Sequence, residues 1–383
     1  ALPPVRSLRA EGAAASASPP VARVVPKTMI EHGRSRTDNY DWLRNTEDPE
    51  GIAYVQAENA YAERNLRPIE PLIDEIAAEL RAREAREDAS VPYLDNGYLY
   101  EQRFTDGAQY PVIVRRKDLP GAPEEVVLDI AALAAGHPYY RVNRWDVSPD
   151  GARVAFAVDF TGGRRHRLFV RTIATGETHD EGIVDAAASF AFAADSETLF
   201  YVRVDPQTVR SHELWRHRAG ADPATDALVY AEPDPQFEIY VFLSKSREYI
   251  LLACDQENTS EIRYLRADQP TGAFAVMEPR KTGVRYFANH VADTFFIRTN
   301  LDAPDYRLMR APQDKPDAAH WAELVPNRPG YYLWRFEPFN DFVAFDAEHE
   351  GAVSAHVLRL SDMREVTVPL PTTIGVATTD FFF

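Results

Sequence analysis

A repeated unit of strands and turns constrains the fold of this chain more than any other sequence feature. Each unit has a turn, a strand of alternating apolar and polar residues, a polar loop and a second strand that carries basic side chains. Successive turns lie 54, 45, 50, 47 and 48 residues apart, at Gly97, Gly151, Ser196, Ser246, Asp293 and Asp341. Such a period is what a four-stranded antiparallel blade with its turns requires, so the repeat predicts a β-propeller.

The strands support a mainly β fold. Beyond residue 90, short runs rich in Val, Tyr, Phe, Ile and Thr alternate in character, as in Tyr98 to Phe104, Val154 to Phe160 and Leu199 to Val204. A β-sandwich would have turns every 8 to 12 residues without the longer period. A seventh turn is due after Asp341, and Thr379-Asp380 before three phenylalanines fits it. We therefore interpret the chain as a propeller of the seven-bladed type whose last blade is incomplete.

A helical extension precedes the strands, from Asp48 to about Glu87. Asp48 and Pro49 supply a cap and a first helical residue, and Pro68 restarts the pattern. Apolar residues in the second helix recur at helical spacing and predict a narrow apolar face opposite a charged back. They are Ile69, Leu72, Ile73, Ile76 and Leu80.

Charge and composition exclude several classes of partner. The 59 acidic and 42 basic residues give a net charge of −17, which disfavours nucleic acid and favours cationic ligands. The longest stretch without Asp, Glu, Lys or Arg, residues 366–379, is shorter than the roughly 18 to 20 residues that span a bilayer. Residues 1–25, rich in Ala, Pro and Ser, read as a flexible tail. Cys254 is the single cysteine, so we expect a cytoplasmic protein, with a periplasmic or exported one as the alternative.

No catalytic, cofactor-binding or metal-binding residues are predicted. The string from Gly33 to Thr37 lacks the second glycine of a nucleophile elbow and does not join a strand to a helix. No phosphate loop or dinucleotide-binding fingerprint is present. Cys254 lies in an apolar strand and is interpreted as a core residue.

The histidines and one basic cluster also favour structural interpretations. His212 and His217, and likewise His349 and His356, lack the spacing of metal ligands and are interpreted as surface or capping residues. The basic run from Gly162 to Arg167 is interpreted as a solvated hairpin loop, although it could contact anions.

Several motifs in order resemble the N-terminal part of enzymes of the oligopeptidase B type, in the prolyl oligopeptidase family of serine peptidases. The likeness covers about residues 24 to 370. Its motifs include His32-Gly33, Asp38-Asn39-Tyr40-Asp41-Trp42-Leu43-Arg44, Asp48-Pro49-Glu50, Glu58-Asn59-Ala60-Tyr61, Val147-Ser148-Pro149-Asp150-Gly151 and Thr198-Leu199-Phe200-Tyr201-Val202-Arg203.

The resemblance implies a seven-bladed propeller preceded by helices that pack on a following α/β-hydrolase domain with a Ser, Asp and His triad. Such an enzyme cleaves short peptides after Lys or Arg, and its propeller excludes folded proteins. We expect a tail over 1–25, a helical extension over 26–88 and a propeller over 89–383, with the hydrolase domain absent. No catalytic residue carries over, so this part alone is expected to be inactive.

These expectations leave two functions open. The first is the gating part of a serine oligopeptidase, whose partners are short cationic peptides and the missing hydrolase domain. The alternative is a free-standing propeller that binds peptides or proteins. In both cases we expect self-association, because an incomplete last blade exposes a strand edge and the apolar face of the second helix has no partner.

Overall fold

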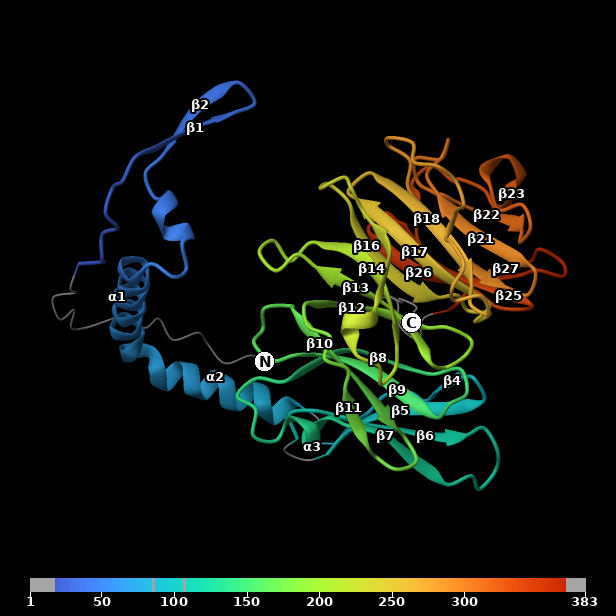
Figure 1. The fold of residues 1–383 in the computed structure, drawn as a ribbon, viewed down its shortest axis with the longest axis horizontal. Helices are drawn as coiled ribbons and strands as arrows, with labels where there is room; N and C mark the ends of the chain where they lie inside the picture. The colour runs from blue at the N-terminus through green and yellow to red at the C-terminus, as the bar shows by residue number, and fades with distance from the viewer. Residues whose placement is uncertain (1–17, 85–86, 106–107, 370–383) are drawn as a thin grey trace, which may run out of the picture. The chain divides into compact units, whose positions relative to one another are not determined.

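The computed structural model describes residues 18–84, 87–105 and 108–369. The chain forms two compact units, Ala1–Arg86 and Glu87–Phe383 (Figure 1). Within the described ranges, no helix combines the length and the apolar character needed to cross a membrane. The turn predicted at Thr379-Asp380 lies outside the described residues, as do residues 1–17 of the predicted tail.

The first unit contains a hairpin and two helices. The hairpin pairs β1 (Lys27–Glu31) with β2 (Arg34–Asp38), and a 3-10 turn, η1 (Asp41–Arg44), follows it. The helices are α1 (Pro49–Leu66) and α2 (Glu70–Arg83), with η2 (Arg67–Ile69) between them.

The helical prediction for this unit is confirmed in its details. The Asp48 carboxylate accepts the backbone N–H of Glu50 at 2.9 Å, which caps α1, and the break falls at Pro68. All five residues of the predicted apolar face are exposed, from 41% at Leu72 to 56% at Leu80; four lie in α2, and Ile69 is the last residue of η2.

The second unit contains six antiparallel groups of chain-adjacent strands, which follow one another from teal to red in Figure 1 and which we call the first to sixth sheets. The second and third are joined into one eight-stranded sheet by a single pairing, between His166 and Ala186. The first sheet comprises β3 (Asp88–Ala89), β4 (Tyr93–Asp95), β5 (Tyr98–Phe104), β6 (Val112–Lys117) and β7 (Glu124–Asp129), before the short helix α3 (Ile130–Ala134). The second comprises β8 (Arg141–Val147), β9 (Arg153–Asp159), β10 (His166–Thr172) and β11 (Thr178–Asp180). The third comprises β12 (Ala186–Phe192), β13 (Thr198–Val204), β14 (Ser211–Arg218) and β15 (Ala227–Ala231), with η3 (Pro223–Thr225).

The last three sheets repeat this order. The fourth comprises β16 (Glu238–Leu243), β17 (Tyr249–Gln256), β18 (Thr259–Arg266) and β19 (Ala275–Val276). The fifth comprises β20 (Tyr286–Val291), β21 (Thr294–Thr299), β22 (Arg307–Pro312) and β23 (Ala322–Val325), with η4 (Ala318–His320). The sixth comprises β24 (Tyr331–Pro338), β25 (Phe342–His349), β26 (Ala352–Arg359) and β27 (Glu365–Thr367).

Each predicted turn lies directly before a long central strand of a sheet and joins it to the strand that precedes it, as between β8 and β9 or between β16 and β17. Gly97 and Gly151 adopt positive φ, which glycine tolerates, and Ser196, Arg247 and Ala292 adopt it in the corresponding turns. The strand before each predicted turn was not identified from the sequence. In the second to sixth sheets this strand is the first of its sheet, and in the first sheet it is β4, which follows the two-residue β3.

The core lies between neighbouring sheets, and both faces of the middle strands are buried. Along β17, Ile250, Leu252 and Cys254 pack with residues of the third sheet, whereas Leu251 and Ala253 pack with the fifth. Successive strand residues point to opposite faces, so one strand serves two core clusters. The interpretation of Cys254 as a core residue is confirmed, since its side chain is fully buried.

Candidate functional site

Several first strands of neighbouring sheets lie beside one another, and their residues line two cavities that share Arg144, Ala188 and Phe242. In β16, Ile239 is buried in a core cluster, whereas Glu238 and Tyr240 line a cavity. The twofold alternation of a strand produces this division. The cavity-lining residues are therefore set by register, and we treat the cavities as the candidate functional site.

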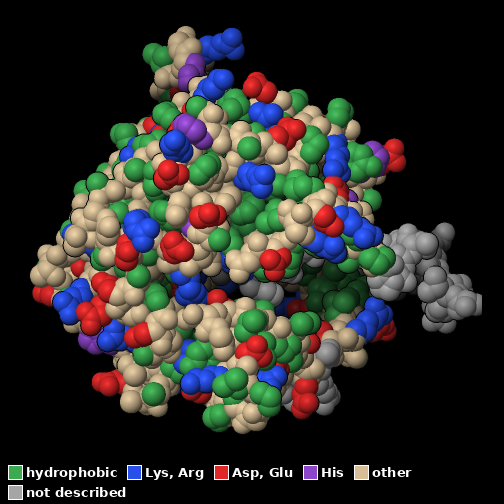
Figure 2. All heavy atoms as spheres, turned by 90° about the vertical axis from the view of Figure 1, so that its right-hand side faces the viewer, with side chains coloured by type: hydrophobic (Ala, Val, Ile, Leu, Met, Phe, Trp, Pro, Cys, Tyr) green, Lys and Arg blue, Asp and Glu red, His purple; other side chains and the backbone are tan. Residues whose placement is uncertain are grey.

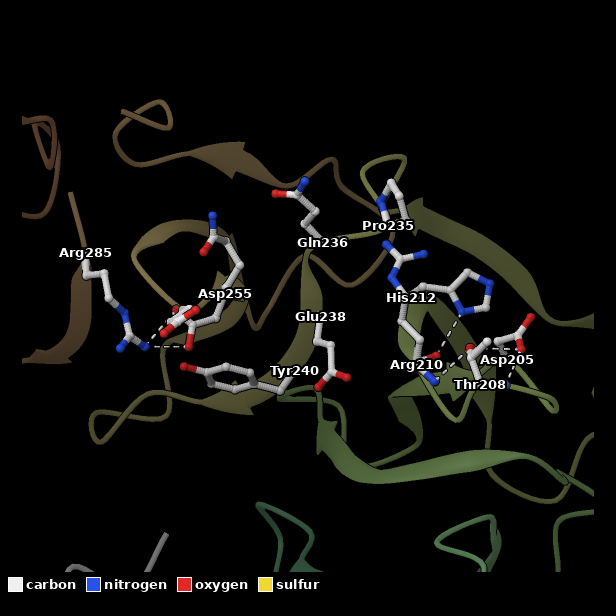
Figure 3. A pocket seen from close by; sticks show the side chains of 12 residues that line it. Asp205, Thr208, Arg210, His212, Pro235, Gln236, Glu238, Tyr240, Asp255 and Arg285 are labelled. Carbon is white, nitrogen blue, oxygen red and sulfur yellow. Dashed lines mark hydrogen bonds and ion pairs between the residues drawn. The ribbon is translucent and has the colours of Figure 1, made fainter. Parts of the chain in front are cut away.

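The first cavity, which we call the rim pocket, has a volume of about 780 Å³ and is rich in carboxylates (Figure 3). Its basic groups are already engaged. Arg285 donates to both carboxylate oxygens of Asp255, at 3.0 and 2.7 Å. Arg210 donates to three backbone carbonyls, the nearest 2.6 Å away at Asp234. The remaining acids are Asp205, Glu238 and Glu257.

Asp205 in this pocket remains ionised. Its carboxylate accepts the backbone N–H of Thr208 at 2.7 Å and that of Gln207 at 2.9 Å. The bonds from Thr208, followed by that from Gln207, hold the pKa of Asp205 below its ordinary value. The rim pocket is thus an anionic surface at neutral pH.

The second cavity, the inner chamber, has a volume of about 470 Å³ and shares Tyr240, Asp255 and Arg285 with the rim pocket. Its walls are aromatic and arginine-rich. The aromatic residues include Phe242, Phe287, Trp334 and Phe336, and the arginines are Arg144, Arg285, Arg298 and Arg335.

The third cavity, the turn-side cavity, has a volume of about 440 Å³ and shares Arg144 and Phe242 with the inner chamber. Two ion pairs cross it between sheets that are not neighbours. Arg247 of the fourth sheet lies 2.6 Å from Asp95 of the first, and Lys245 lies 2.7 Å from Glu337 of the sixth. Burial raises the pKa of Glu337, and Lys245 opposes that shift.

Two serine–histidine contacts lie outside these cavities. Ser246 Oγ lies 2.8 Å from His290 Nδ1. Ser354 Oγ lies 2.8 Å from His356 Nε2, and the other ring nitrogen lies 3.0 Å from Glu365. The second contact therefore has the connectivity of a serine–histidine–acid relay.

The surroundings of both contacts indicate structural roles. Burial lowers the pKa of His290 to about 4, which makes it a weak base. Glu365 is bound by two nitrogens of Arg328, and the His356 ring stacks on Phe345 with 5.0 Å between centroids. None of these serines or histidines lines the three cavities. Neither serine therefore lies in one of the three cavities where a substrate could reach it.

The interpretation of four histidines as surface or capping residues is only partly correct. His212 lines the rim pocket, and His349 stacks on Tyr331 at 3.9 Å. His217 and His356 are instead buried, and His217 lies between two carboxylates, Glu181 at 2.9 Å and Asp226 at 2.6 Å. The surface interpretation is wrong for these two.

The basic run from Gly162 to Arg167 joins β9 to β10, as a hairpin loop should. The backbone N–H groups of Gly162 and Arg164, and that of the preceding Thr161, donate to the Asp159 carboxylate. Arg165 pairs with Asp185 at 2.6 Å and Arg167 with Asp180 at 2.5 Å, so these acidic residues partly neutralise the basic run.

The N-terminal beta-propeller domain model of prolyl oligopeptidase matches residues 19–380. The chain is 37% identical to dipeptidyl aminopeptidase BI of Pseudoxanthomonas mexicana over 365 residues, covering 90% of this chain and 50% of that protein. It is 27% identical to protease 2 of Moraxella lacunata, covering 91% of this chain and 51% of the relative.

Solved structures show the same fold. Oligopeptidase B from Leishmania major superposes with a TM-score of 0.84 at 24% identity, covering 93% of this chain and 54% of that one. The chain spans about half the length of the curated relatives it matches. With its six repeated sheets and the family match over most of its length, the chain belongs to the prolyl oligopeptidase family, as its N-terminal β-propeller part.

Proposed function

We propose that this chain forms the channel through which a serine oligopeptidase selects short peptides, while an α/β-hydrolase part performs the acyl transfer. The observation that carries the proposal is a set of three cavities that share lining residues, two of which are lined mainly by the first strands of the sheets. Family membership supports a peptidase, and the doubled length of the relatives supports a second part.

Selection by size follows from what lines the channel. Each cavity is hundreds of Å³ in volume, which suits an extended peptide or another small ligand but not a folded domain. The ion pairs Arg247–Asp95 and Lys245–Glu337 narrow the turn-side cavity. Rotation of these side chains would widen the cavity, and side-chain rotation is faster than a movement that separates strands.

Specificity for Lys or Arg is the finer part of the proposal. The carboxylates of the rim pocket and the net charge of −17 favour the approach of cationic peptides, over a Debye length of about 8 to 10 Å. One relative carries the name dipeptidyl aminopeptidase, so removal of N-terminal dipeptides is the second specificity to measure.

The test joins this chain to the hydrolase half of the 37% identical relative, in place of that enzyme's own propeller half. The fusion should hydrolyse arginyl and lysyl amides of short peptides and leave a folded protein that displays the same residues uncut. This chain alone should hydrolyse neither. Equal cleavage of the folded protein, or turnover by the chain alone that survives further purification, would refute the proposal.

A further inference from the structure

The inner chamber carries the opposite charge from the chain as a whole. Its lining includes four guanidinium groups and one carboxylate, Asp255, in a chain whose net charge is −17. Acidic and basic side chains are interspersed over the face shown in Figure 2, so no comparable excess of one sign marks that face. A cluster of arginines in an enclosed cavity attracts anions more strongly than the same groups on a surface.

Two of these guanidinium groups form no close ion pair within the described residues. No described carboxylate lies within ion-pair distance of Arg144 or Arg298, whereas Arg285 is paired with Asp255 and Arg335 with Asp346. The carboxylate whose charge acts on Arg144 is Asp146, which lines the turn-side cavity and whose pKa is raised by burial and lowered by Arg144. Arg298 donates to the backbone carbonyl of Leu333 at 2.6 Å, and burial lowers its pKa.

Of the four arginines in the inner chamber, Arg144 has a buried hydrogen-bond donor that no described acceptor satisfies. Its Nε is buried without a hydrogen-bond partner, and its guanidinium group lies 5.5 Å from the centroid of the Phe190 ring. A buried donor without an acceptor is costly, and a bound anion removes that cost. Because Arg144 lines both the inner chamber and the turn-side cavity, an anion beside it would lie within the channel.

We propose that the inner chamber is a binding site for the carboxylate of a peptide, held by Arg144 and Arg298 with an apolar side chain against the aromatic wall. Guanidinium groups bind carboxylates through paired, charge-assisted hydrogen bonds. Phe242, Phe287 and Phe336 offer the apolar contact. That the ligand is a peptide rests on the proposed function, whereas its negative charge rests on the chamber alone.

The carboxylate can come from the peptide C-terminus or from an Asp or Glu side chain, and three probes separate the two sources. The first is acetyl-Ala-Ala-Phe with a free carboxylate, the second is the same peptide as its amide, and the third is acetyl-Ala-Glu-Phe amide. Titration calorimetry with the full chain measures each affinity. The free acid, the Glu peptide or both should bind at least about tenfold more tightly than the neutral amide.

Arg144→Gln should reduce that preference to less than about threefold, and Arg144→Lys should retain part of it. Neither variant removes a hydrogen-bonded partner, so both should fold. Arg218→Gln is the matched control, because Arg218 is 73% exposed and pairs with Glu197, away from the three cavities. Its preference should equal that of the parent chain.

Equal binding of the acids and the amide by the parent chain would overturn the inference, as would an unchanged preference in Arg144→Gln. These titrations need no hydrolase part. A fusion that cleaves folded proteins would refute the gating proposal without affecting the binding result. Equal binding of the acids and the amide would refute the anion site without affecting the gating proposal.

Discussion

His217 shows what a single residue contributes to holding two sheets together. Its ring, on the third sheet, bridges Glu181 from the end of the second sheet and Asp226, which also accepts the hydroxyl of Tyr201 at 2.9 Å. The alternation of a strand places His212 and His217 on opposite faces, but it does not show how deeply each side chain is buried. The two carboxylates are 36 and 9 residues away, so no local motif could reveal the contact.

Replacing His217 by Gln should lower the free energy of unfolding by roughly 3 kcal/mol, because two buried carboxylates lose the cation between them. Burial alone lowers the pKa of His217, but the hydrogen bonds and charges of Glu181 and Asp226 raise it above its ordinary value. The stabilisation should therefore be complete below pH 6.5 and decline as pH rises through the raised pKa. Urea unfolding from pH 6 to pH 9 measures both effects.

His349→Gln serves as the matched control, since His349 is partly exposed and stacks on Tyr331. It should change stability by less than about 0.5 kcal/mol. If the parent chain and His217→Gln lose stability in parallel above pH 6.5, the assigned role of His217 is wrong.

Ser354 tests whether the relay with His356 and Glu365 does chemistry. We expect the chain to hydrolyse p-nitrophenyl acetate no faster than Ser354→Ala does, because Arg328 neutralises Glu365 and the serine lines none of the channel cavities. The substitution should cost about 1 kcal/mol of stability through its lost hydrogen bond. A serine-dependent burst of nitrophenol would contradict this interpretation.

At the scale of elements, the sequence identified the middle strands best. The strands after each predicted turn, such as β9 and β17, carry long apolar runs because both of their faces are buried. First strands such as β16 mix core residues with the polar lining of the channel, which blurs the alternation. Last strands such as β11 are too short, at three residues, to give a pattern.

The exposed apolar face of α2 makes a testable prediction about assembly. We expect the parent chain to self-associate, and Ile73→Glu combined with Ile76→Glu should shift its mass by light scattering toward the 43.2 kDa of one chain. Glu75→Gln, on the same helix, should leave the mass unchanged. A parent chain that already runs as a sharp monomer would count against the expectation.

At the scale of the whole molecule, the repeat predicted a ring of similar sheets but not the charges inside it. A period fixes where each strand begins, whereas the channel lining depends on which residues from several sheets meet. Arg247 and Asp95 are 152 residues apart and belong to the fourth and first sheets. Neither residue stands out in the sequence, because each lies in or beside a turn, where polar and charged residues are common.

The Arg247–Asp95 pair should hold non-neighbouring sheets together, and a double-mutant cycle measures that coupling. Arg247→Gln and Asp95→Asn should each destabilise the chain, while the double variant should be more stable than the sum of the two losses by about 1 kcal/mol or more. Arg266 and Asp268, an exposed pair within one sheet, provide the control cycle, with a coupling below that of the channel pair. Additive losses at Arg247 and Asp95 would mean that the pair contributes nothing to joining the first and fourth sheets, and the closure of the turn-side cavity would then depend on the neighbouring sheets alone.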